Sequence, residues 1–207
     1  MCGIAGIVSH KDNDEIGSLL KRMLQTMEHR GPDSAGFVIG NNVKRKKKIQ
    51  DLNLGNQRGR IAMGHTKLTT AEKTPNLQPL QSENKKLALL NNGKIYNYLD
   101  LSLELNGCCA SSSDTDSEVI LKFVKKNYNG NLLEAVKKIL PMLDGGYAMA
   151  ITDNKQVIIA RDKIGVRHLY FCRTGKYTAF ASEKNLLWKL QKKRQNITGC
   201  FRDMWRS

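Results

Sequence analysis

The chain begins Met1-Cys2-Gly3-Ile4-Ala5-Gly6-Ile7-Val8, and two signals overlap in this stretch. Residues 4–8 form a short apolar run, which is typical of a strand buried on both faces. Cys2 stands two residues before this run, directly after Met1. Removal of Met1 is expected because the next residue is small, and it would leave Cys2 with a thiol and a free α-amine, whose ordinary pKa values are about 8.5 and 7.7–8. Nucleophile and base would then reside on one residue, although the position of a cysteine alone is more often an accident of sequence.

Residues 14–29 are predicted to form an amphipathic helix. Its apolar residues recur at helical spacing and form one continuous face: Ile16, Leu19, Leu20, Met23 and Met27. Asp14 and Glu15 would lie in the first turn, where the helix dipole favours negative charge. Gly31 and Pro32 are expected to end the helix.

Strands outnumber helices in the rest of the chain. Strands are expected over residues 35–40, 61–68, 86–90, 146–152, 156–161, 168–173 and 177–182. Helices are expected after the capping box Thr115-x-x-Glu118, over residues 132–140, and from about Glu183. Residues 41–60 are interpreted as an exposed hairpin or loop, and residues 69–82 as a turn-rich segment. This order lacks the regular alternation of a parallel sheet, so it predicts mainly antiparallel sheets with helices packed outside them.

The composition fits one globular domain. Hydrophobic residues make up 40% of the 207 residues, enough for a buried core without disulfides. The five cysteines and four scattered histidines lack metal-ligand spacing, so no metal site is expected. The sequence contains no apolar run of about 18 residues, and its N-terminus does not resemble a signal peptide. We therefore expect a cytoplasmic protein with no membrane partner.

The chain is strongly basic, because 34 Lys and Arg against 19 Asp and Glu give a net charge of +15. Part of this charge lies in two runs, Lys44-Arg45-Lys46-Lys47-Lys48 and Lys192-Lys193-Arg194. Such a balance can indicate an acidic partner such as nucleic acid. Neither run is interleaved with aromatic residues, and no nucleic-acid-binding motif accompanies them, which favours a solvated loop and tail.

Six short motifs occur in order along the chain. They are Met1-Cys2-Gly3-Ile4-Ala5-Gly6, Arg30-Gly31-Pro32-Asp33-Ser34-Ala35-Gly36, Gly64-His65-Thr66, Asn92-Gly93-Lys94-Ile95-Tyr96-Asn97, Ser113-Asp114-Thr115-Asp116-Ser117-Glu118 and Arg161-Asp162-Lys163-Ile164-Gly165. Together they resemble the class II glutamine amidotransferase domain, most closely the N-terminal half of glutamine-dependent asparagine synthetase; the Arg-Gly-Pro-Asp motif favours that branch. The resemblance covers residues 2–190 as one domain, with a basic irregular tail over residues 191–207.

The resemblance implies an α+β fold, the four-layer αββα sandwich of N-terminal-nucleophile hydrolases with two mainly antiparallel sheets. It also implies that L-glutamine is hydrolysed to glutamate and ammonia. Cys2 would form a γ-glutamyl thioester, and the oxyanion would accept hydrogen bonds from the Asn92 side chain and the Gly93 backbone N–H. No cofactor is implied for this step.

The resemblance also implies which residues bind the substrate or support the site. The positions that bind glutamine correspond to Lys67, Leu68, Lys94 and Asp116, with Asp116 as ligand of the α-ammonium group. The positions that shape the surroundings of the nucleophile correspond to Arg30 and Asp33.

Structural explanations stay open for several of these residues. Asn92-Gly93 is also a common type I′ hairpin turn and would follow the strand over residues 86–90. Asp116 could simply compensate the dipole of the helix that it begins. Arg30 and Asp33 could form an ion pair at a helix end.

Three positions depart from the asparagine synthetase pattern. Lys67 stands where an arginine grips the α-carboxylate of glutamine, and lysine keeps the charge but loses the two-pronged geometry. Lys94 replaces a glutamate that contacts the substrate ammonium, which a lysine would repel unless it points away. His168 replaces a proline, and we interpret this change as structural.

Neither a Ser-Gly-Gly-x-Asp-Ser loop nor a Walker-type phosphate loop occurs in the sequence. We therefore expect the chain to supply ammonia to a synthetase partner domain or subunit, where ATP and magnesium would be required. Whether the chain is a truncated synthetase or a stand-alone subunit stays open. The alternative is an inactive amidotransferase-like binding or regulatory module, motivated by Lys67 and Lys94.

Overall fold

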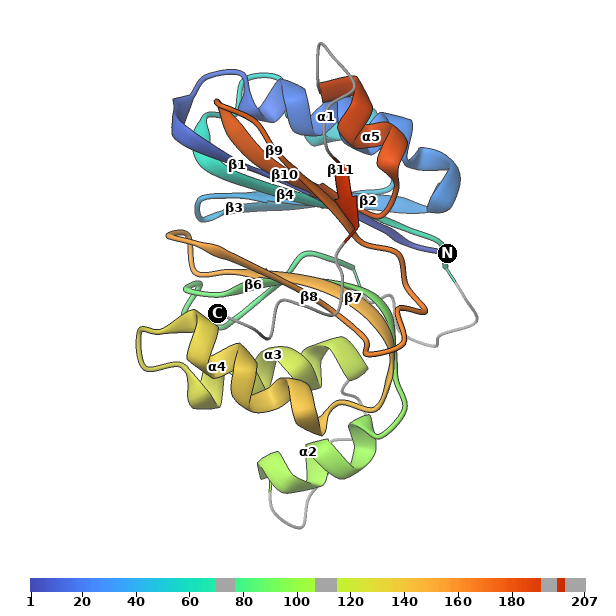
Figure 1. The fold of residues 1–207 in the computed structure, drawn as a ribbon, viewed down its shortest axis with the longest axis vertical. Helices are drawn as coiled ribbons and strands as arrows, with labels where there is room; N and C mark the ends of the chain where they lie inside the picture. Colours follow the sequence, from blue (N-terminus) through green and yellow to red (C-terminus); the bar gives the residue numbers. More distant parts are fainter. Residues whose placement is uncertain (70–76, 107–114, 191–196, 200–207) are drawn as a thin grey trace.

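The computed structural model describes residues 1–69, 77–106, 115–190 and 197–199. Two antiparallel sheets stack face to face, and helices cover the outer face of each (Figure 1). From top to bottom in Figure 1, the layers are helices α1 and α5, a seven-stranded sheet, a four-stranded sheet, and helices α3 and α4. The predicted αββα sandwich is therefore confirmed.

The first sheet has the strand order β11-β9-β10-β1-β4-β2-β3. Its strands are β1 (Gly3–Asn13), β2 (Ser34–Ile39), β3 (Asn42–Lys46), β4 (Gly59–Lys67), β9 (Tyr170–Arg173), β10 (Tyr177–Ala181) and β11 (Ile197–Gly199). The second sheet, β5-β6-β7-β8, contains β5 (Leu80–Gln81), β6 (Ala88–Ile95), β7 (Gly145–Thr152) and β8 (Val157–Arg161).

Five α-helices complete the described fold: α1 (Ile16–Thr26), α2 (Tyr98–Asn106), α3 (Asp116–Asn127), α4 (Leu132–Ile139) and α5 (Lys184–Leu190). Short 3-10 helices span Glu28–Arg30, Ile49–Leu52 and Leu140–Met142. None of these helices combines the length and apolar character that a membrane crossing requires.

Three apolar layers separate the elements. One lies between α1, α5 and the first sheet, and another between the second sheet and helices α3 and α4. The middle layer joins the two sheets and includes Ile4, Val38, Met63, Leu90 and Ala148. Because side chains alternate across a strand, this middle layer identifies which residues of each strand face the other sheet.

The helix expected over residues 14–29 is shorter than predicted. It begins at Ile16, and Asp14 and Glu15 precede it, so the expectation of an acidic first turn is wrong. The side chain of Asn13 accepts a hydrogen bond from the Glu15 N–H, 2.8 Å away, which occupies that backbone group before the helix starts. After Thr26 the chain tightens into the 3-10 helix Glu28–Arg30.

The two helices after Thr115 follow the sequence signals closely. The reciprocal hydrogen bonds of the Thr115–Glu118 capping box are both present at the start of α3. Helix α4 ends at Ile139, just before the 3-10 turn that contains Pro141. Helix α2 was not predicted, because its leucines at 99, 101, 103 and 105 alternate as in a strand. In the folded chain Leu101 is buried, whereas Leu99 and Leu103 are exposed.

Two further outcomes concern the ends of predicted strands. The strand expected over residues 86–90 is β6, which continues to Ile95. Asn92 and Gly93 therefore pair within a sheet, and the alternative of a hairpin turn is wrong. Beyond residue 190 the structure describes only β11, which pairs with β9. The proposed boundary at residue 190 stays a prediction.

Candidate active site

Cys2 lies at the start of a central strand of the first sheet. β1 begins at the next residue and pairs with β10 on one side and β4 on the other. Ile4 ties this end of β1 to Ser182, since its N–H donates to the Ser182 Oγ at 3.0 Å and its carbonyl accepts from the Ser182 N–H at 2.9 Å. The half-buried Cys2 thiol lies 3.9 Å from the carbonyl oxygen of Leu68.

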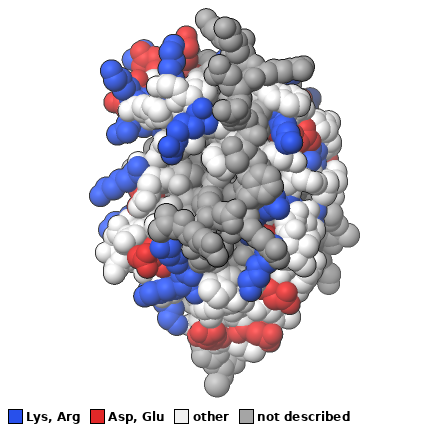
Figure 2. Space-filling view, in the orientation of Figure 1, with Lys and Arg blue, Asp and Glu red and all other residues white. Residues whose placement is uncertain are grey.

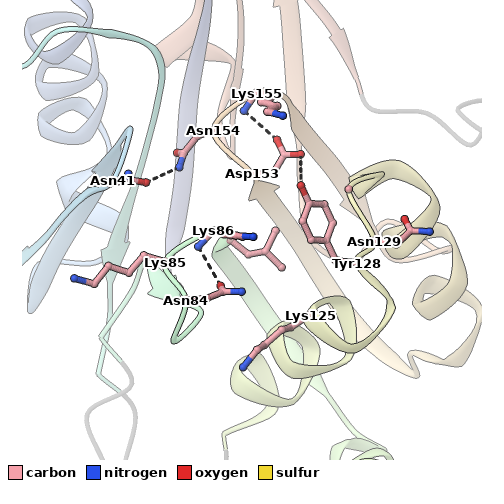
Figure 3. A pocket seen from close by; sticks show the side chains of 12 residues that line it. Asn41, Asn84, Lys85, Lys86, Lys125, Tyr128, Asn129, Asp153, Asn154 and Lys155 are labelled. Atoms are coloured by element: carbon pink, nitrogen blue, oxygen red, sulfur yellow. Dashed lines mark hydrogen bonds between the residues drawn. The ribbon is translucent and has the colours of Figure 1, made fainter.

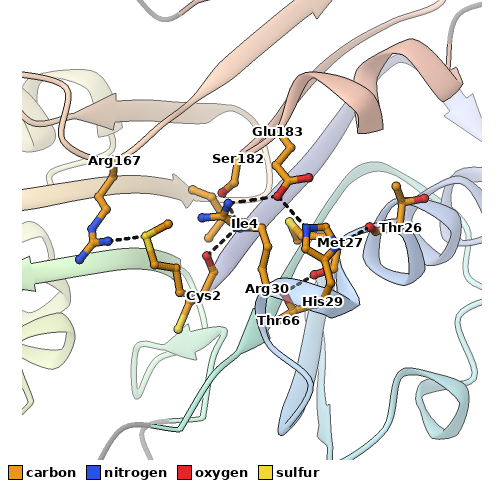
Figure 4. A network of polar contacts seen from close by, with 11 residues as sticks. Cys2, Ile4, Thr26, Met27, His29, Arg30, Thr66, Arg167, Ser182 and Glu183 are labelled. Carbon is orange, nitrogen blue, oxygen red and sulfur yellow. Dashed lines mark hydrogen bonds and ion pairs between the residues drawn. The ribbon is translucent and has the colours of Figure 1, made fainter.

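Arg30 braces the backbone of Cys2 (Figure 4). Its Nε donates to the Cys2 carbonyl at 3.1 Å, and its Nη1 contacts Glu183 Oε1 at 3.1 Å. His29 Nε2 lies 2.9 Å from the same carboxylate oxygen. Burial alone would raise the pKa of Glu183, but the hydrogen bonds from Arg30 and His29 outweigh it and lower that pKa. Glu183 thus links the nucleophile to the start of α5.

The rest of the Arg30–Gly36 motif supports the end of β4. The Asp33 N–H donates to the Lys67 carbonyl at 3.1 Å, and the Asp33 carboxylate accepts from the Thr69 N–H. A side chain at Gly31 would collide with the backbone at Lys67, at 2.5–2.6 Å. The carboxylate that Arg30 contacts is Glu183, so the alternative of an Arg30–Asp33 ion pair is wrong. The motif instead holds Cys2 and the segment Lys67–Thr69 together.

The first sheet directs three functional candidates toward the second sheet. Ile4 and Met63 belong to the layer between the sheets. Since side chains alternate, Cys2, His65 and Lys67 face the same space as Ile4 and Met63. In the antiparallel pairing Ile4 lies opposite His65, which places Cys2 beside the end of β4. The sheet therefore gathers a thiol, an imidazole and an ammonium at one end of the sandwich.

His65 is completely enclosed and uncharged. Burial, and to a smaller extent the neighbouring charge of Lys67, lower its pKa from 6.5 to about 3, against a hydrogen bond to the Asn91 backbone that acts in the opposite direction. Its Nε2 has no partner among the described residues. The Asn91 contact joins the first sheet to the second next to the candidate oxyanion residues.

The second sheet contributes Asn92, Gly93 and Lys94. Leu90 belongs to the layer between the sheets, so Asn92 and Lys94 face the first sheet. Asn92 is buried with 3% of its surface exposed, and its Nδ2 has no partner among the described residues. An unpartnered buried amide donor is costly unless a ligand meets it. This geometry fits a group that donates to an oxyanion.

Gly93 is required by close packing within the sheet. A Cβ atom at this position would lie 2.3 Å from the Gly146 carbonyl oxygen and 2.5 Å from the Tyr147 Cα. Tyr147 lies opposite Gly93 in the pairing of β6 with β7. Its N–H donates to the Asp162 carboxylate and its carbonyl accepts from the Asp162 N–H, both on the side of β8. The Gly93 N–H is therefore directed away from β7, toward the edge of β6 that pairs with β5 at Ala88 and Leu89.

The remaining substrate-binding candidates lie around this edge. Lys94 is exposed, and its Nζ lies 5.0 Å from the centre of the Tyr98 ring, a cation–π geometry that holds the ammonium at the rim. Asp116 is buried at the start of α3 and accepts hydrogen bonds from the Ile95 N–H at 3.0 Å and from Ser117. A carboxylate has about four acceptor sites, so Asp116 can also bind an ammonium group.

Sequence reasoning missed several residues that hold this site. Glu183 and Ser182 are far from Cys2 in the sequence and carry no local motif. Asp162 lies in a recognised motif, and its carboxylate accepts from the backbone N–H groups of residues 165–167. That loop presents Arg167, whose Nη1 lies 2.8 Å from the Met1 sulfur (Figure 4). His168 stacks on Tyr170, with ring centres 6.0 Å apart, in keeping with a structural role.

A polar pocket of about 570 Å³ lies at the opposite end of the sandwich (Figure 3). It is formed by the turns between β2 and β3, between β5 and β6, and between β7 and β8, together with the end of α3. Of the four lysines that line it, Lys85, Lys125 and Lys155 extend in different directions. This arrangement does not converge on a single anion.

The basic residues are spread over the surface. Figure 2 shows Lys and Arg across the visible face with acidic side chains among them. Lys44 to Lys46 lie on β3, the edge strand of the first sheet, and Lys47 and Lys48 follow it in an exposed segment. Charged side chains on an edge strand oppose pairing with another chain. Within the described residues, no group of His, Cys, Asp or Glu has the arrangement of a metal site.

Comparisons with known proteins agree with this geometry. A family model described as "Glutamine amidotransferase domain" matches residues 1–200. The chain is 34% identical to a putative glutamine-hydrolysing asparagine synthetase of Methanocaldococcus jannaschii over 99% of its length. It is also 35% identical to glutamine–fructose-6-phosphate aminotransferase of Bacillus subtilis over 79% of its length. The chain spans 36% and 29% of these two relatives, about a third of their length.

Solved structures show the same relationship. Glutamine phosphoribosylpyrophosphate amidotransferase of Bacillus subtilis, complexed with ADP and GMP, superposes with a TM-score of 0.74 at 30% identity. The match covers 90% of this chain and 43% of that one. A glutamine aminotransferase class-II domain protein of Silicibacter pomeroyi shares the fold, with a TM-score of 0.55 at 10% identity.

Proposed function

The chain belongs to the glutamine amidotransferase domain family, and on this premise we propose that Cys2 is its catalytic nucleophile and Asn92 and Gly93 its oxyanion donors. As a class II domain it is an enzyme that hydrolyses glutamine and releases ammonia. The observation that carries the assignment of residues is the buried Asn92 amide, which faces the sheet that bears Cys2 and whose Nδ2 has no partner in the part of the chain that the structure describes.

The chemistry follows from these groups once Met1 has been removed. The freed α-amine accepts the thiol proton, and the Cys2 sulfur bonds to the carboxamide carbon of glutamine. The oxygen becomes an anion that accepts hydrogen bonds from Asn92 Nδ2 and the Gly93 N–H. When the C–N bond breaks, the amine returns its proton to the leaving ammonia. Water then cleaves the γ-glutamyl thioester, which releases glutamate and restores the thiol.

The substrate is held by groups at the same end of the sandwich. Asp116 binds the α-ammonium of glutamine, and Lys67 binds its α-carboxylate. The Lys94 ammonium is held over the Tyr98 ring, and in this proposal that contact keeps it from repelling the substrate ammonium. Leu68 contributes its carbonyl, which already contacts the Cys2 thiol. Arg30 and Asp33 support the site through the backbone.

None of the residues assigned above is proposed to bind the acceptor of the ammonia. The chain spans only about a third of these two relatives, and we propose a synthetase domain or subunit as partner. Coverage of nearly the whole chain by the asparagine synthetase relative supports asparagine synthesis as the use of the ammonia. The glutaminase step then needs no cofactor, whereas ATP and magnesium would act at the partner. A cytoplasmic location stays our expectation.

The test is glutamine turnover by protein from which Met1 has been removed, verified by mass spectrometry. We expect glutamate and ammonia in equal amounts from the wild type and none above background from Cys2→Ala. Cys172→Ala is the matched control, because Cys172 is a buried thiol on β9 within the outer core layer. Equal rates for wild type and Cys2→Ala would overturn the proposal.

A second candidate function is an inactive binding or regulatory module, motivated by Lys67 and Lys94 at positions where the resemblance to asparagine synthetase implies arginine and glutamate. It predicts that a glutamine-mimicking electrophile does not label Cys2 although circular dichroism shows a folded protein. Labelling of Cys2 that free glutamine suppresses would exclude this candidate.

A further inference from the structure

A buried network of polar side chains surrounds the segment Asn92–Lys94. On the edge of β6, Gln78 binds both backbone groups of Asn91: its Oε1 accepts from the Asn91 N–H at 2.6 Å, and its Nε2 donates to the Asn91 carbonyl at 3.0 Å. Only 7% of the Gln78 surface is exposed. The carboxamide thus imitates the backbone of a neighbouring strand.

The position of Gln78 explains why this imitation is needed. β5 pairs with β6 only through Leu80 opposite Leu89 and Gln81 opposite Ala88. Asn91 lies beyond this short ladder and is buried, with 3% of its surface exposed. Without Gln78 the Asn91 N–H would be a buried donor that the sheet does not satisfy, at a cost of about 1–3 kcal/mol.

The other end of the segment is fixed by α3. The Ile95 N–H donates to Asp116 Oδ2 at 3.0 Å. The side chain of Asn91 donates to Ser117 Oγ at 3.0 Å, and Ser117 in turn donates to Asp116 Oδ1 from its backbone at 2.7 Å. Ser117 is 2% exposed and Asp116 is 6% exposed. The hydrogen bonds therefore run unbroken from Gln78 through Asn91 to Asp116.

The Gly93 N–H points to the same edge of β6 as these hydrogen bonds. Alternate residues of an antiparallel strand direct their backbone groups to opposite sides. Asn91 points its groups to Gln78 and Ile95 points its N–H to Asp116, so Gly93 between them points to that edge as well. Gln78 and Asp116 thus bracket the candidate oxyanion donor.

Resting on the proposed function, we infer that Gln78 is a positioning residue for the oxyanion hole and acts through the backbone of Asn91. Its two hydrogen bonds fix the position of the β6 backbone at Asn91. The Gly93 N–H and the Asn92 side-chain amide can then both donate to the same oxyanion. A misplacement of such donors by about 1 Å can cost about 100-fold in rate. Ser117 supports the same segment from the helix side.

The test compares Gln78→Met with wild-type protein lacking Met1. Methionine keeps the length of the side chain but neither hydrogen bond. We expect kcat for glutamine to fall about 10- to 100-fold, with KM and the rate of Cys2 alkylation by iodoacetamide changed less than about twofold, because neither quantity depends on the oxyanion. Gln81→Met, on β5, is the matched control and should leave all three unchanged.

A second variant separates positioning from simple damage to the fold. In Gln78→Glu the carboxylate accepts from the Asn91 N–H but repels the Asn91 carbonyl, whereas the protonated carboxyl can donate to it. Burial favours the protonated form. The ratio of the kcat of Gln78→Glu to that of wild type should therefore rise as pH falls from 8 to 5.

The outcomes are distinct. No turnover by wild type and Gln81→Met would refute the proposed glutaminase function itself. Active wild type together with an unchanged kcat in Gln78→Met, or a pH-independent Gln78→Glu ratio, would overturn the positioning role alone. A parallel loss of kcat and alkylation rate in Gln78→Met would also overturn it, because the damage would then extend to Cys2.

Discussion

The two sheets hold their halves of the site by different means. On the first sheet, Cys2 is braced by Arg30, whose guanidinium contacts Glu183. His29 contacts the same carboxylate, and its side chain is 60% exposed. On the second sheet, the oxyanion segment is bracketed by side chains that are at most 7% exposed. Charged contacts that reach the surface respond to pH and salt, whereas buried hydrogen bonds are shielded from both. The contacts that hold Cys2 should therefore weaken or strengthen with pH and salt, whereas the contacts that hold the oxyanion segment should not.

The largest effect is expected at the buried end of this comparison. Asn92→Ala removes the amide that faces the first sheet, and loss of one oxyanion donor typically costs about 2.7–4 kcal/mol, or about 10²- to 10³-fold in kcat. KM for glutamine should change little. Steady-state glutaminase assays check this prediction, with Asn129→Ala at the distant pocket as control. A kcat within about threefold of wild type would show that Gly93 alone suffices as donor.

The next effect concerns His65, a buried residue of the first sheet that forms a hydrogen bond with the Asn91 backbone of the second sheet. Its pKa is about 3 in the folded protein against 6.5 as the ordinary value. Below pH 6.5 the unfolded chain binds a proton that the folded chain refuses, so stability falls as pH falls from 6.5 toward 3, by about 1.4 kcal/mol per pH unit where one proton separates the states.

His65→Gln keeps a polar side chain but removes this proton uptake. The free energy of unfolding is measured with urea between pH 7 and pH 4.5. Its slope against pH should be less steep in the variant, by the amount that corresponds to the uptake of about one proton on unfolding. Equal slopes in the two proteins would show that His65 is protonated to the same extent in the folded and unfolded states, which would contradict its enclosure.

Sequence patterns predicted the parts of this molecule that depend on local order. The apolar period of α1, the capping box at Thr115 and the six ordered motifs predicted the layers, the family and the residues Cys2, Asn92 and Asp116. The partners that hold those residues were not predictable. Gln78 reaches Asn91 across the end of β5, and Glu183 reaches Arg30 from the opposite end of the chain. Such contacts depend on tertiary packing and leave no period or spacing in the sequence.

The hairpin explanation of Asn92-Gly93 failed for a related reason. The dipeptide has a strong local preference for a turn, but β7 pairs with β6 along residues 88–95 and carries the chain straight through. Tertiary pairing overrides local propensity at this point. A residue pair that keeps a turn preference inside a buried strand is a signal of a functional constraint.

A smaller effect is expected where glutamine recognition departs from the family. Lys67→Arg restores a two-pronged donor for the α-carboxylate. One added hydrogen bond is worth about 1 kcal/mol, so KM for glutamine should fall about fivefold while kcat stays within about twofold. Lys67→Gln should raise KM, and it serves as the opposite control. An unchanged KM in both variants would show that Lys67 does not contact the substrate and that another cation binds the carboxylate.

The smallest effect is expected at Glu183, on the charged side of the comparison. Because its pKa in the folded protein is lowered by Arg30 and His29, Glu183 stabilises the fold at pH values above the ordinary carboxyl pKa, and this contribution disappears as pH falls through the lowered value. The Glu183 side chain is 21% exposed and that of His29 is 60% exposed, so solvent screens part of this cluster. Glu183→Gln should therefore destabilise the protein by at most about 1 kcal/mol at pH 7. The loss should be smaller at about pH 3.5, nearer the pKa of the carboxyl group, and in about 0.5 M salt, which screens its charge. Urea unfolding measures both differences, with Glu134→Gln, whose exposed pair lies on α4, as matched control. A loss that persists undiminished at low pH and high salt would mean that Glu183 supports Cys2 by packing rather than by charge, and the contrast between the two sheets would then not hold.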